Sequence, residues 1–294
     1  MENKALFAAF TGNFIFGFSF IFSKLALGVA SPFILLTYRF GVSLIILTIL
    51  AALGKFKVNF RGKRIFSLLV LGIFQPVLYF IGENYGILYS NATFAAVMIA
   101  LVPIFSTIFA SLFLGEKATG LQWVFCIVSI SGVIITATQT SSDGGTKIAG
   151  ILLLLLAVAA ETGYAYLGRK ISAEFTAAER TYAMMLCGTV VFSALALCEN
   201  AGNLRAFAEP LFSPVFIAGL FYLSVLSSVT AFLCLNFAAS HLPVARTVVF
   251  ANITTVVSVF AGVIFLHEKC TALSIFASAM IIAGILGVQK FAAK

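Results

Sequence analysis

Charged residues are scarce in this sequence. Asp, Glu, Lys and Arg together supply 10% of the 294 residues, whereas 62% of the residues are hydrophobic. The mean hydropathy is +1.12. A water-soluble globule cannot cover its surface with so few charges, so most of this surface must face lipid. The composition therefore predicts an all-α integral membrane protein. No polar stretch is long enough to form a separate soluble domain.

Motifs for nucleotide, metal or covalent chemistry are also missing. The chain contains no GxxxxGK[ST], HExxH or GxSxG pattern, and its five cysteines show no CxxC or Cys/His spacing. The two histidines, His241 and His267, lie at expected helix ends without a cluster of carboxylates nearby. We therefore expect no catalytic residue, no metal and no cofactor. An intramembrane enzyme is one alternative function, and a channel, for which no Gly-rich filter or acidic ring is present, is the other.

Apolar runs of about 20 residues, the length that crosses a bilayer as a helix, occur throughout the chain. Polar loops at 55–64 and 199–214 and a Ser/Gly-rich stretch at 140–145 separate some of these runs. We expect ten transmembrane helices, at residues 6–29, 33–53, 66–89, 93–114, 121–138, 148–168, 182–198, 215–238, 244–266 and 273–291.

Lysine and arginine fall mainly in alternate loops of this arrangement, so their positions predict the orientation in the membrane. If the N-terminus is cytoplasmic, the inner side collects Lys4, Lys55, Lys57, Arg61, Lys63, Arg64, Lys117, Arg169, Lys170, Arg180, Lys290 and Lys294. The outer side has only Lys147, Arg205 and Lys269, with Lys24 near the outer end of the first helix. We expect both termini in the cytoplasm, at the cell inner (plasma) membrane. The net charge of +8 fits contact with lipid headgroups rather than with nucleic acid.

The sequence repeats at an offset of 152 residues. The ungapped pattern FL-x-EK-x-T-x-L begins at Phe113 and again at Phe265, and the shift also aligns Asn84 with Asn236 and Gly132 with Gly284. Five expected helices per copy place the second copy upside down in the membrane. The sequence thus predicts two inverted five-helix repeats, 1–139 and 148–294, joined by the linker 140–147.

These repeats carry residues typical of one family. The expected fourth helix of each copy ends in Leu-x-Glu-Lys, and Pro103 lies within the first of these two helices. Phe16-Gly17 is similar to the Trp-Gly motif in the first helix of this family, with Phe in place of Trp. Arg39 is similar to the arginine in the family's second helix. Over nearly its whole length the chain resembles the drug/metabolite transporter superfamily, specifically its EamA-type members. The resemblance implies a ten-helix secondary transporter, often an exporter of amino acids, drugs or other small organic metabolites.

Charged residues inside the apolar runs are the first candidates for a substrate or coupling site, because a charge in hydrocarbon needs a partner or a watery cavity. At a rise of about 1.5 Å per residue, Lys24, Arg39 and Glu83 lie at similar depth below the outer surface. Glu161 lies at about 10 Å from the inner end of its helix, and Arg246 lies in the first turn of another.

Each of these charges also has a purely structural interpretation. Lys24 and Arg246 can extend to the headgroups at the two surfaces, and Arg39 with Glu83 can form a static ion pair. In the functional interpretation these groups bind the polar ends of a substrate, and Glu83 or Glu161 carries a coupling proton. The sequence leaves both interpretations open.

Uncharged polar residues extend the candidate site. Asn84 follows Glu83, and the hydroxyl groups of Tyr79 and Tyr164 need partners if they are buried. Gln75 precedes Pro76, and a proline inside a helix kinks it and frees a carbonyl group. We expect kinks at Pro76 and Pro103, where freed backbone groups face protein or a cavity. The expected partners are a small-molecule substrate, the lipid bilayer and protons.

Overall fold

The structure, a computed structural model, describes residues 2–113, 119–142, 147–171, 173–201, 203–241, 244–267 and 271–291. Every regular element in these ranges is helical, and they contain no strand. The elements are α1 (Glu2–Leu27), α2 (Pro32–Ala52), α3 (Ile65–Gly72), η1 (Ile73–Leu78), α4 (Tyr79–Leu88), α5 (Ala92–Ile99), α6 (Val102–Phe113), α7 (Gly120–Ser142), α8 (Ile148–Ile171), α9 (Ala177–Glu199), α10 (Arg205–Ala208), η2 (Glu209–Phe212), α11 (Pro214–Phe221), η3 (Tyr222–Ala231), α12 (Phe232–His241), α13 (Val244–Leu266) and α14 (Ala272–Lys290).

Seven helical stretches among the described residues are long and apolar enough to cross a membrane. They are Glu2–Leu27, Pro32–Ala52, Ile65–Leu88, Ala92–Phe109, Ile148–Gly168, Ala177–Glu199 and Pro214–Leu235. Three shorter apolar helices, Gly120–Ile135, Ile253–Leu266 and Ile275–Val288, accompany them. The prediction of an all-helical membrane protein is confirmed, whereas the number of spans stays a prediction.

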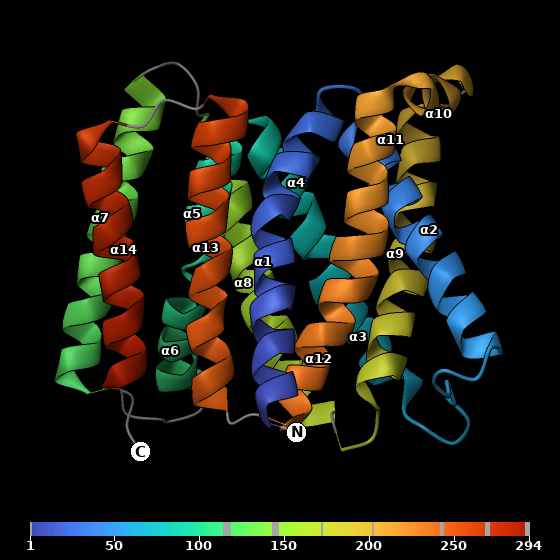
Figure 1. Cartoon of the computed structure of the whole chain (residues 1–294), viewed down its shortest axis with the longest axis horizontal. Helices are drawn as coiled ribbons and strands as arrows, with labels where there is room; N and C mark the ends of the chain where they lie inside the picture. Colours follow the sequence, from blue (N-terminus) through green and yellow to red (C-terminus); the bar gives the residue numbers. More distant parts are fainter. Residues whose placement is uncertain are drawn as a thin grey trace.

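The long helices run roughly side by side, so that the chain passes repeatedly between two opposite sides of the molecule (Figure 1). The lower side in Figure 1 holds the start of α1 and the end of α14, and the upper side holds α10. The main helix pairs are α7 with α14, α1 with α13, α2 with α9 and α4 with α8. Helices distant in sequence thus hold the bundle together.

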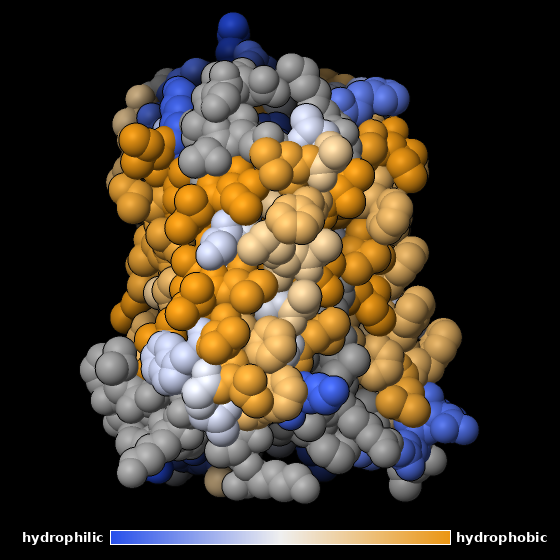
Figure 2. Space-filling model, turned by 90° about the vertical axis from the view of Figure 1, so that its left-hand side faces the viewer, coloured by the Kyte–Doolittle hydropathy of each residue, from blue (hydrophilic) through white to orange (hydrophobic). Residues whose placement is uncertain are grey.

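The outer surface matches the apolar part of a bilayer. Figure 2 shows the face formed largely by α7 and α14, where hydrophobic residues cover a broad central belt and hydrophilic residues gather toward the two ends. Ile127 on α7 is 63% exposed and Phe276 on α14 is 58% exposed. Large exposed apolar side chains are favourable only where lipid replaces water, so the belt marks the membrane-spanning part of the surface.

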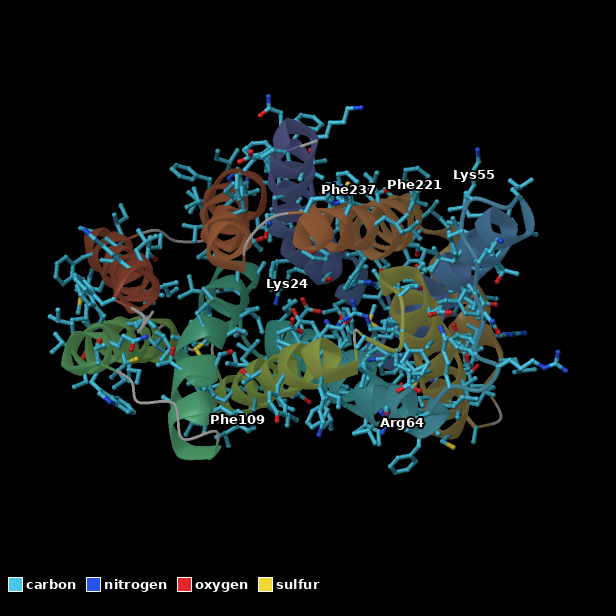
Figure 3. All side chains as sticks on the ribbon, turned by 90° about the horizontal axis from the view of Figure 1, so that it is seen from below. Lys24, Lys55, Arg64, Phe109, Phe221 and Phe237 are labelled. Carbon is cyan, nitrogen blue, oxygen red and sulfur yellow. The ribbon has the colours of Figure 1, made fainter. Side chains whose placement is uncertain are left out.

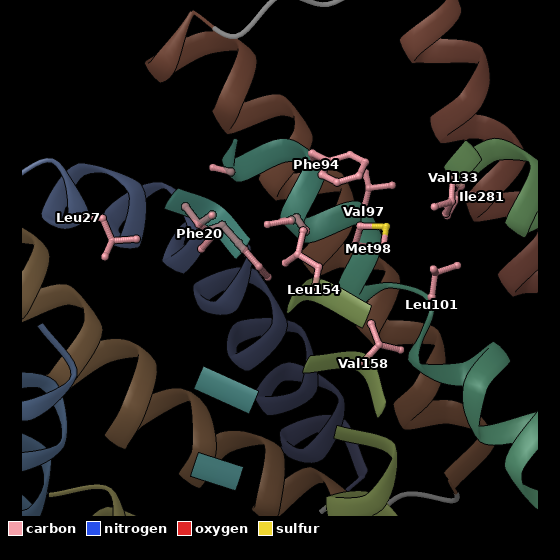
Figure 4. Close-up of a cluster of buried hydrophobic side chains, with 14 of the residues drawn as sticks. Phe20, Leu27, Phe94, Val97, Met98, Leu101, Val133, Leu154, Val158 and Ile281 are labelled. Carbon is pink, nitrogen blue, oxygen red and sulfur yellow. The ribbon is translucent and has the colours of Figure 1, made fainter. Parts of the chain in front are cut away.

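Two apolar clusters fill the interior. The larger cluster includes Phe20, Phe94 and Leu154 and joins α1, α5 and α8 with other helices (Figure 4). The second is built on α2, α4 and α9, where the Phe40 ring packs edge-to-face on Phe80 with centroids 5.0 Å apart. The candidate polar residues on α2 and α4 lie beside this second cluster.

Helix α9 begins earlier than the sequence indicates. Residues 182–198 were the expected span, but Thr176 accepts a hydrogen bond from the Glu179 backbone N–H, and Glu179 in turn accepts one from the Thr176 N–H. This capping box starts the helix at Ala177. The predicted start of this helix was wrong because it was taken from the apolar run, and the first turn of the helix is polar.

Both expected proline-associated breaks are present. The helix that contains Pro76 changes to a π-helical segment at Ile73–Leu78, and Gln75 leaves helical geometry with φ −140° and ψ 116°. The next expected span divides into α5, which ends at Ile99, and α6, which begins at Val102 one residue before Pro103. Proline removes a backbone donor and crowds the preceding turn, which accounts for both positions.

Ion pairs fasten the long lower-side loop to the second part of the chain. Lys63 Nζ lies 2.6 Å from Glu179 Oε2, and Arg64 Nε lies 3.2 Å from Glu174 Oε2. The Arg64 backbone N–H also donates to Glu174, and this bond together with the guanidinium holds the pKa of the Glu174 carboxyl below its usual range. The loop between α2 and α3 is therefore tied to the α8–α9 connection.

Glycines let the helix pairs approach closely. A Cβ at Gly82 in α4 would lie 2.4 Å from the Leu153 carbonyl oxygen and 2.9 Å from the Ala157 nitrogen of α8. A Cβ at Gly284 in α14 would lie 2.8 Å from the Phe125 carbonyl oxygen of α7. Because these neighbours are backbone atoms, they cannot move aside cheaply, and small residues at such contacts are a general device of membrane helices.

We expect Gly82→Ala to lower the free energy of unfolding in detergent by about 1–3 kcal/mol, because the added methyl group overpacks the α4–α8 contact. Gly41→Ala is the matched control, since a Cβ at Gly41 meets nothing within 4 Å. The control should be neutral or slightly stabilising, as alanine favours a helix more than glycine does. Equal thermal stability of the two variants would contradict the close α4–α8 packing.

Candidate functional site

Two π-helical segments face the centre of the bundle, and at one of them, η1, the helix is broken at Gln75. The π-helical segments η1 and η3 interrupt two apolar spans, and a shift of 152 residues places Ile73–Leu78 within Tyr222–Ala231. Both segments contact α8, α9, α2 or α1 on the inside of the bundle. π-Helical turns occur often at functional sites, because they leave backbone groups free and redirect side chains. Here they carry Gln75 and a set of serines inward.

Arg39 of α2 is held by η3. Its Nε donates to Ser228 Oγ at 2.9 Å and its Nη2 to Ser227 Oγ at 3.2 Å. The guanidinium carbon lies 4.5 Å from the centre of the Phe80 ring, a cation–π contact. Only 3% of Arg39 is exposed, so hydroxyl groups and a ring replace its water. The arginine thus joins α2, α4 and η3 at one point.

Glu83 of α4 lies near this arginine but does not form a salt bridge with it. The two charges interact electrostatically, yet the ion pairs within 4.0 Å among the described residues are those of Lys63 and Arg64. Tyr79 donates to Glu83 Oε1 at 3.5 Å, and Oε2 has no hydrogen-bond partner. The interpretation of Arg39 and Glu83 as a direct ion pair is therefore wrong, because Arg39 turns toward the η3 hydroxyls instead.

Glu161 of α8 joins the same group. Its carboxyl interacts electrostatically with Glu83 and with the Tyr79 hydroxyl, and its Oε2 is buried without a hydrogen-bond partner. Tyr164, almost one turn further along α8, packs against two apolar clusters and interacts with Glu161. The close α4–α8 contact at Gly82 brings these two helices together.

Further buried polar atoms around these residues lack partners. Asn84 uses its Nδ2 to donate to the Phe80 carbonyl at 3.0 Å, but its Oδ1 accepts nothing. Gln75 Oε1, Ser23 Oγ and Ser224 Oγ are likewise buried without a partner. A buried polar atom without a hydrogen bond carries a desolvation penalty of about 1–3 kcal/mol. Because most buried polar groups are hydrogen-bonded, this number of exceptions needs an explanation, such as a bound water or ligand.

Lys24 has a different environment from the one expected. Its Nζ donates to the Ile87 carbonyl at 2.9 Å and to the Ser90 carbonyl at 3.0 Å. These carbonyls lie at the C-terminal end of α4, where a cation satisfies free acceptors and opposes the helix dipole. Lys24 therefore caps α4 rather than extending to the headgroups, and the structure gives it a structural role within α1 and α4.

We group as the polar centre six residues from three spans, Arg39, Gln75, Tyr79, Glu83, Asn84 and Glu161, together with the serines of η3 from a fourth span. It contains one cation, two carboxyl groups, two amides and several hydroxyls. These groups can donate and accept hydrogen bonds and can pair with charges of either sign, so they suit a small polar or zwitterionic solute. The described residues hold no group of three or more metal-ligating side chains.

Sequence reasoning missed the serines of η3. Ser224, Ser227 and Ser228 are all buried and interrupt an apolar span, and Ser43 on α2 lies 3.1 Å from the Ser224 carbonyl oxygen. The offset of 152 residues aligns Ser227 with Gln75, so the repeat itself contained the signal that could have identified this serine.

Some residues that the sequence singles out lie outside the described part of the structure. They are Glu116, Lys117, Glu268 and Lys269, together with the side chain of Arg246.

Comparison with known proteins agrees with this geometry. The EamA-like transporter family matches residues 3–138 and, separately, residues 148–289. The chain belongs to the EamA-like transporter family. It is thus a membrane transporter with several helical spans, as its exposed apolar helices also indicate.

Relatives of this EamA-like transporter come from bacteria and archaea. A protein named uncharacterized transporter YcxC from Bacillus subtilis is 32% identical over 290 residues, covering 97% of this chain and 93% of the relative. An uncharacterized transporter from Archaeoglobus fulgidus is 25% identical and covers 98% and 99%. A probable terminal-alkyne amino-acid exporter from Streptantibioticus cattleyicolor is 27% identical over 208 residues, covering 70% and 67%.

A solved crystal structure shares the fold of this transporter with a TM-score of 0.66 at 16% identity. The alignment covers 99% of this chain and 98% of the other. At this identity the likeness concerns the fold alone.

We expect a double-mutant cycle to show that Arg39 depends on Ser228. Ser228→Ala alone should lower the free energy of unfolding by about 1.5–3 kcal/mol, because it removes a hydrogen bond to a buried charge. In an Arg39→Met background the same serine change should have a much smaller effect. The measurement is denaturant or thermal unfolding in detergent. An equal effect in both backgrounds would contradict the contact.

Proposed function

We propose that this EamA-like transporter moves a small, partly apolar organic solute by alternating access, and that the polar centre is its binding site. The observation that carries the proposal is the set of buried polar atoms without partners on α1, α4, α8 and the two π-helical segments, η1 and η3. A bound solute, or the water it replaces, would supply those missing hydrogen bonds. Discontinuous helices are the usual place for solute binding in transporters of this type.

The proposed architecture is ten spans in two inverted five-helix repeats, 1–139 and 148–294, with the linker 140–147 between them. In support, the family matches the chain twice, once in each proposed repeat. The α7–α14 contact supplies a second argument, because Ser129 donates to the Ile281 carbonyl at 3.3 Å and these positions are 152 residues apart. Gly132 and Gly284, also 152 residues apart, both lie in that contact. Equivalent positions meeting one another are the sign of a pseudo-twofold axis.

The proposed substrate is an amino acid or a similar metabolite, and the proposed direction is export. Arg39 offers a cation for a carboxylate, and Glu83 and Glu161 offer carboxylates for an ammonium group. Phe40 and Phe80 supply apolar surface beside them. The printed name of one relative, a probable amino-acid exporter, agrees with this class of solute.

Protons are the proposed coupling ion. Glu83 and Glu161 lie close enough to interact electrostatically, and each has a buried oxygen without a partner, so two ionised carboxylates here would repel one another. Binding a proton, or the ammonium group of a solute, relieves that repulsion. Competition between the two for the same carboxyl groups would couple solute movement to a pH gradient.

We expect Glu83→Gln and Glu161→Gln proteins in liposomes to lose the dependence of solute flux on an imposed pH gradient. The amide keeps the shape of the side chain and removes only its ability to exchange a proton. Glu199→Gln is the control, because Glu199 lies at the exposed upper end of α9. Retention of the full gradient response by both variants would exclude these residues as proton carriers.

The proposed orientation places both termini in the cytoplasm of the cell, at the inner (plasma) membrane. The lower side in Figure 1 holds the start of α1, the loop between α2 and α3 and the ends of α8 and α14, and these segments carry the exposed cations Lys4, Lys55, Lys57, Arg61, Arg64, Lys170 and Lys290. The upper side holds α10, which begins at Arg205, and the start of α8, which Lys147 precedes. Cytoplasmic loops of membrane proteins have such an excess of Lys and Arg.

A cysteine-free protein with a single new cysteine tests this orientation. Asn203→Cys, on the upper side, should react with an impermeant maleimide in intact cells, and Asn59→Cys, on the lower side, should react only after permeabilisation. Both native residues are exposed, so accessibility within the protein does not limit either reaction. The opposite labelling pattern would invert the topology.

A further inference from the structure

An apolar groove of about 500 Å³ lies between α3, η1, α6 and α8, outside the polar centre. Its lining includes Val70, Phe74, Phe109, Ala159, Tyr166 and Leu167. Thr162 also lines the groove, but its hydroxyl donates to the Val158 carbonyl at 2.9 Å, so it presents little polarity. Tyr166 is 41% exposed and Ala159 is also exposed, which shows that the groove opens at the outer surface.

The floor of the groove separates it from the polar centre. The Phe74 ring packs against Gly163, where an added Cβ would lie only 2.7 Å from the ring. Gln75 follows Phe74 in the chain, and Glu161 precedes Thr162, so the two sites lie back to back on η1 and α8. A ligand in the groove therefore contacts η1 and α8, two of the segments that carry the polar centre, without entering it.

The position and length of the groove fit one leaflet of a bilayer. From Ala159 to Leu167, α8 rises about 12 Å, and half of a typical hydrocarbon core is about 15 Å. Helix α8 ends at Ile171 on the lower side, so the groove occupies the half of the span nearest that side. An acyl chain from the lower leaflet would reach along its whole length.

The end of the groove nearest the lower surface is basic. Lys170 is exposed about one turn beyond Leu167, and Arg64, which precedes α3, has an 84% exposed side chain whose Nε pairs with Glu174 Oε2 at 3.2 Å. Seen from below, Arg64 and Phe109 lie along the same edge of the molecule, whereas Lys55 lies toward the opposite edge (Figure 3). Arg64, Lys170 and Glu174 together carry one net positive charge, which complements an anionic headgroup, and basic pockets beside apolar grooves bind such lipids.

We propose that this groove binds one anionic phospholipid of the lower leaflet, with an acyl chain between α3, α6 and α8 and its phosphate near Arg64 and Lys170. The proposal requires only that the chain spans the membrane, and it does not depend on the substrate or the coupling ion. A lipid seated there packs on Phe74 and Gly163 and so supports the broken helix η1 from its outer side.

Brominated lipids that quench tryptophan fluorescence test the proposal. The chain has one tryptophan, Trp123. Trp123→Phe removes it, and Tyr166→Trp places a reporter in the groove; Phe109→Trp is a second reporter if the first variant does not insert. In mixed phosphatidylcholine and phosphatidylglycerol bilayers, brominated phosphatidylglycerol should quench the groove reporter several-fold more strongly than brominated phosphatidylcholine at equal mole fraction.

Matched variants separate the headgroup from the chain. Arg64→Gln combined with Lys170→Gln should abolish the preference for phosphatidylglycerol, whereas Lys55→Gln on the opposite edge should leave it unchanged. Ala159→Phe, which fills the groove, should reduce quenching by both lipids, whereas Ala165→Phe, at an exposed position outside the lining, should not.

Three results would overturn the proposal. Equal quenching by the two lipids would show that no anionic headgroup is recognised. Unchanged quenching in Ala159→Phe would show that the acyl chain is not in the groove. Relief of quenching by a water-soluble amphipathic solute would place the apolar part of that solute, rather than a lipid, in the groove.

Discussion

The burial of the Arg39 guanidinium is the constraint on which the centre of this protein depends. A charge in the apolar part of a membrane protein carries a free-energy cost of several kcal/mol unless polar groups surround it. Here two hydroxyls of η3 and the face of the Phe80 ring surround the charge. To supply those hydroxyls, a span must carry adjacent serines on the side that faces α2, and the π-helical segment η3 does so. The arginine thus fixes α2, α4 and η3 in relation to one another.

Close helix contacts complete this arrangement. Gly82 lets α4 lie directly on the α8 backbone, which brings Glu83 near Glu161. The two carboxyl groups then lie close to the Arg39 guanidinium, and one oxygen of each carboxyl group has no hydrogen-bond partner. Such incomplete satisfaction is destabilising in a static core but useful in a binding site, because a ligand gains the hydrogen bonds that the protein lacks.

Much of the fold follows from the sequence, because apolar length and proline chemistry are local properties. The all-helical membrane fold and the breaks at Pro76 and Pro103 could be predicted, whereas the number of spans and the roles of the candidate residues on α4 and α8 stay predictions. The partner of Arg39 could not. Residue spacing along a helix gives the depth of a side chain, but not the neighbour it turns toward, so Glu83 was expected where Ser227 and Ser228 are found. The π-helical segment η3 was also missed, since it contains no proline.

The central claim is that a transported solute occupies the polar centre. Ser224→Cys in a cysteine-free protein tests it directly, because Ser224 is fully buried and its hydroxyl has no partner. The rate at which a small thiol reagent modifies this cysteine is measured with and without a solute that the liposome assay shows to be transported. The account predicts that saturating solute slows the reaction at Ser224→Cys and leaves the reaction of surface Asn203→Cys unchanged. An unchanged rate at Ser224→Cys would contradict it.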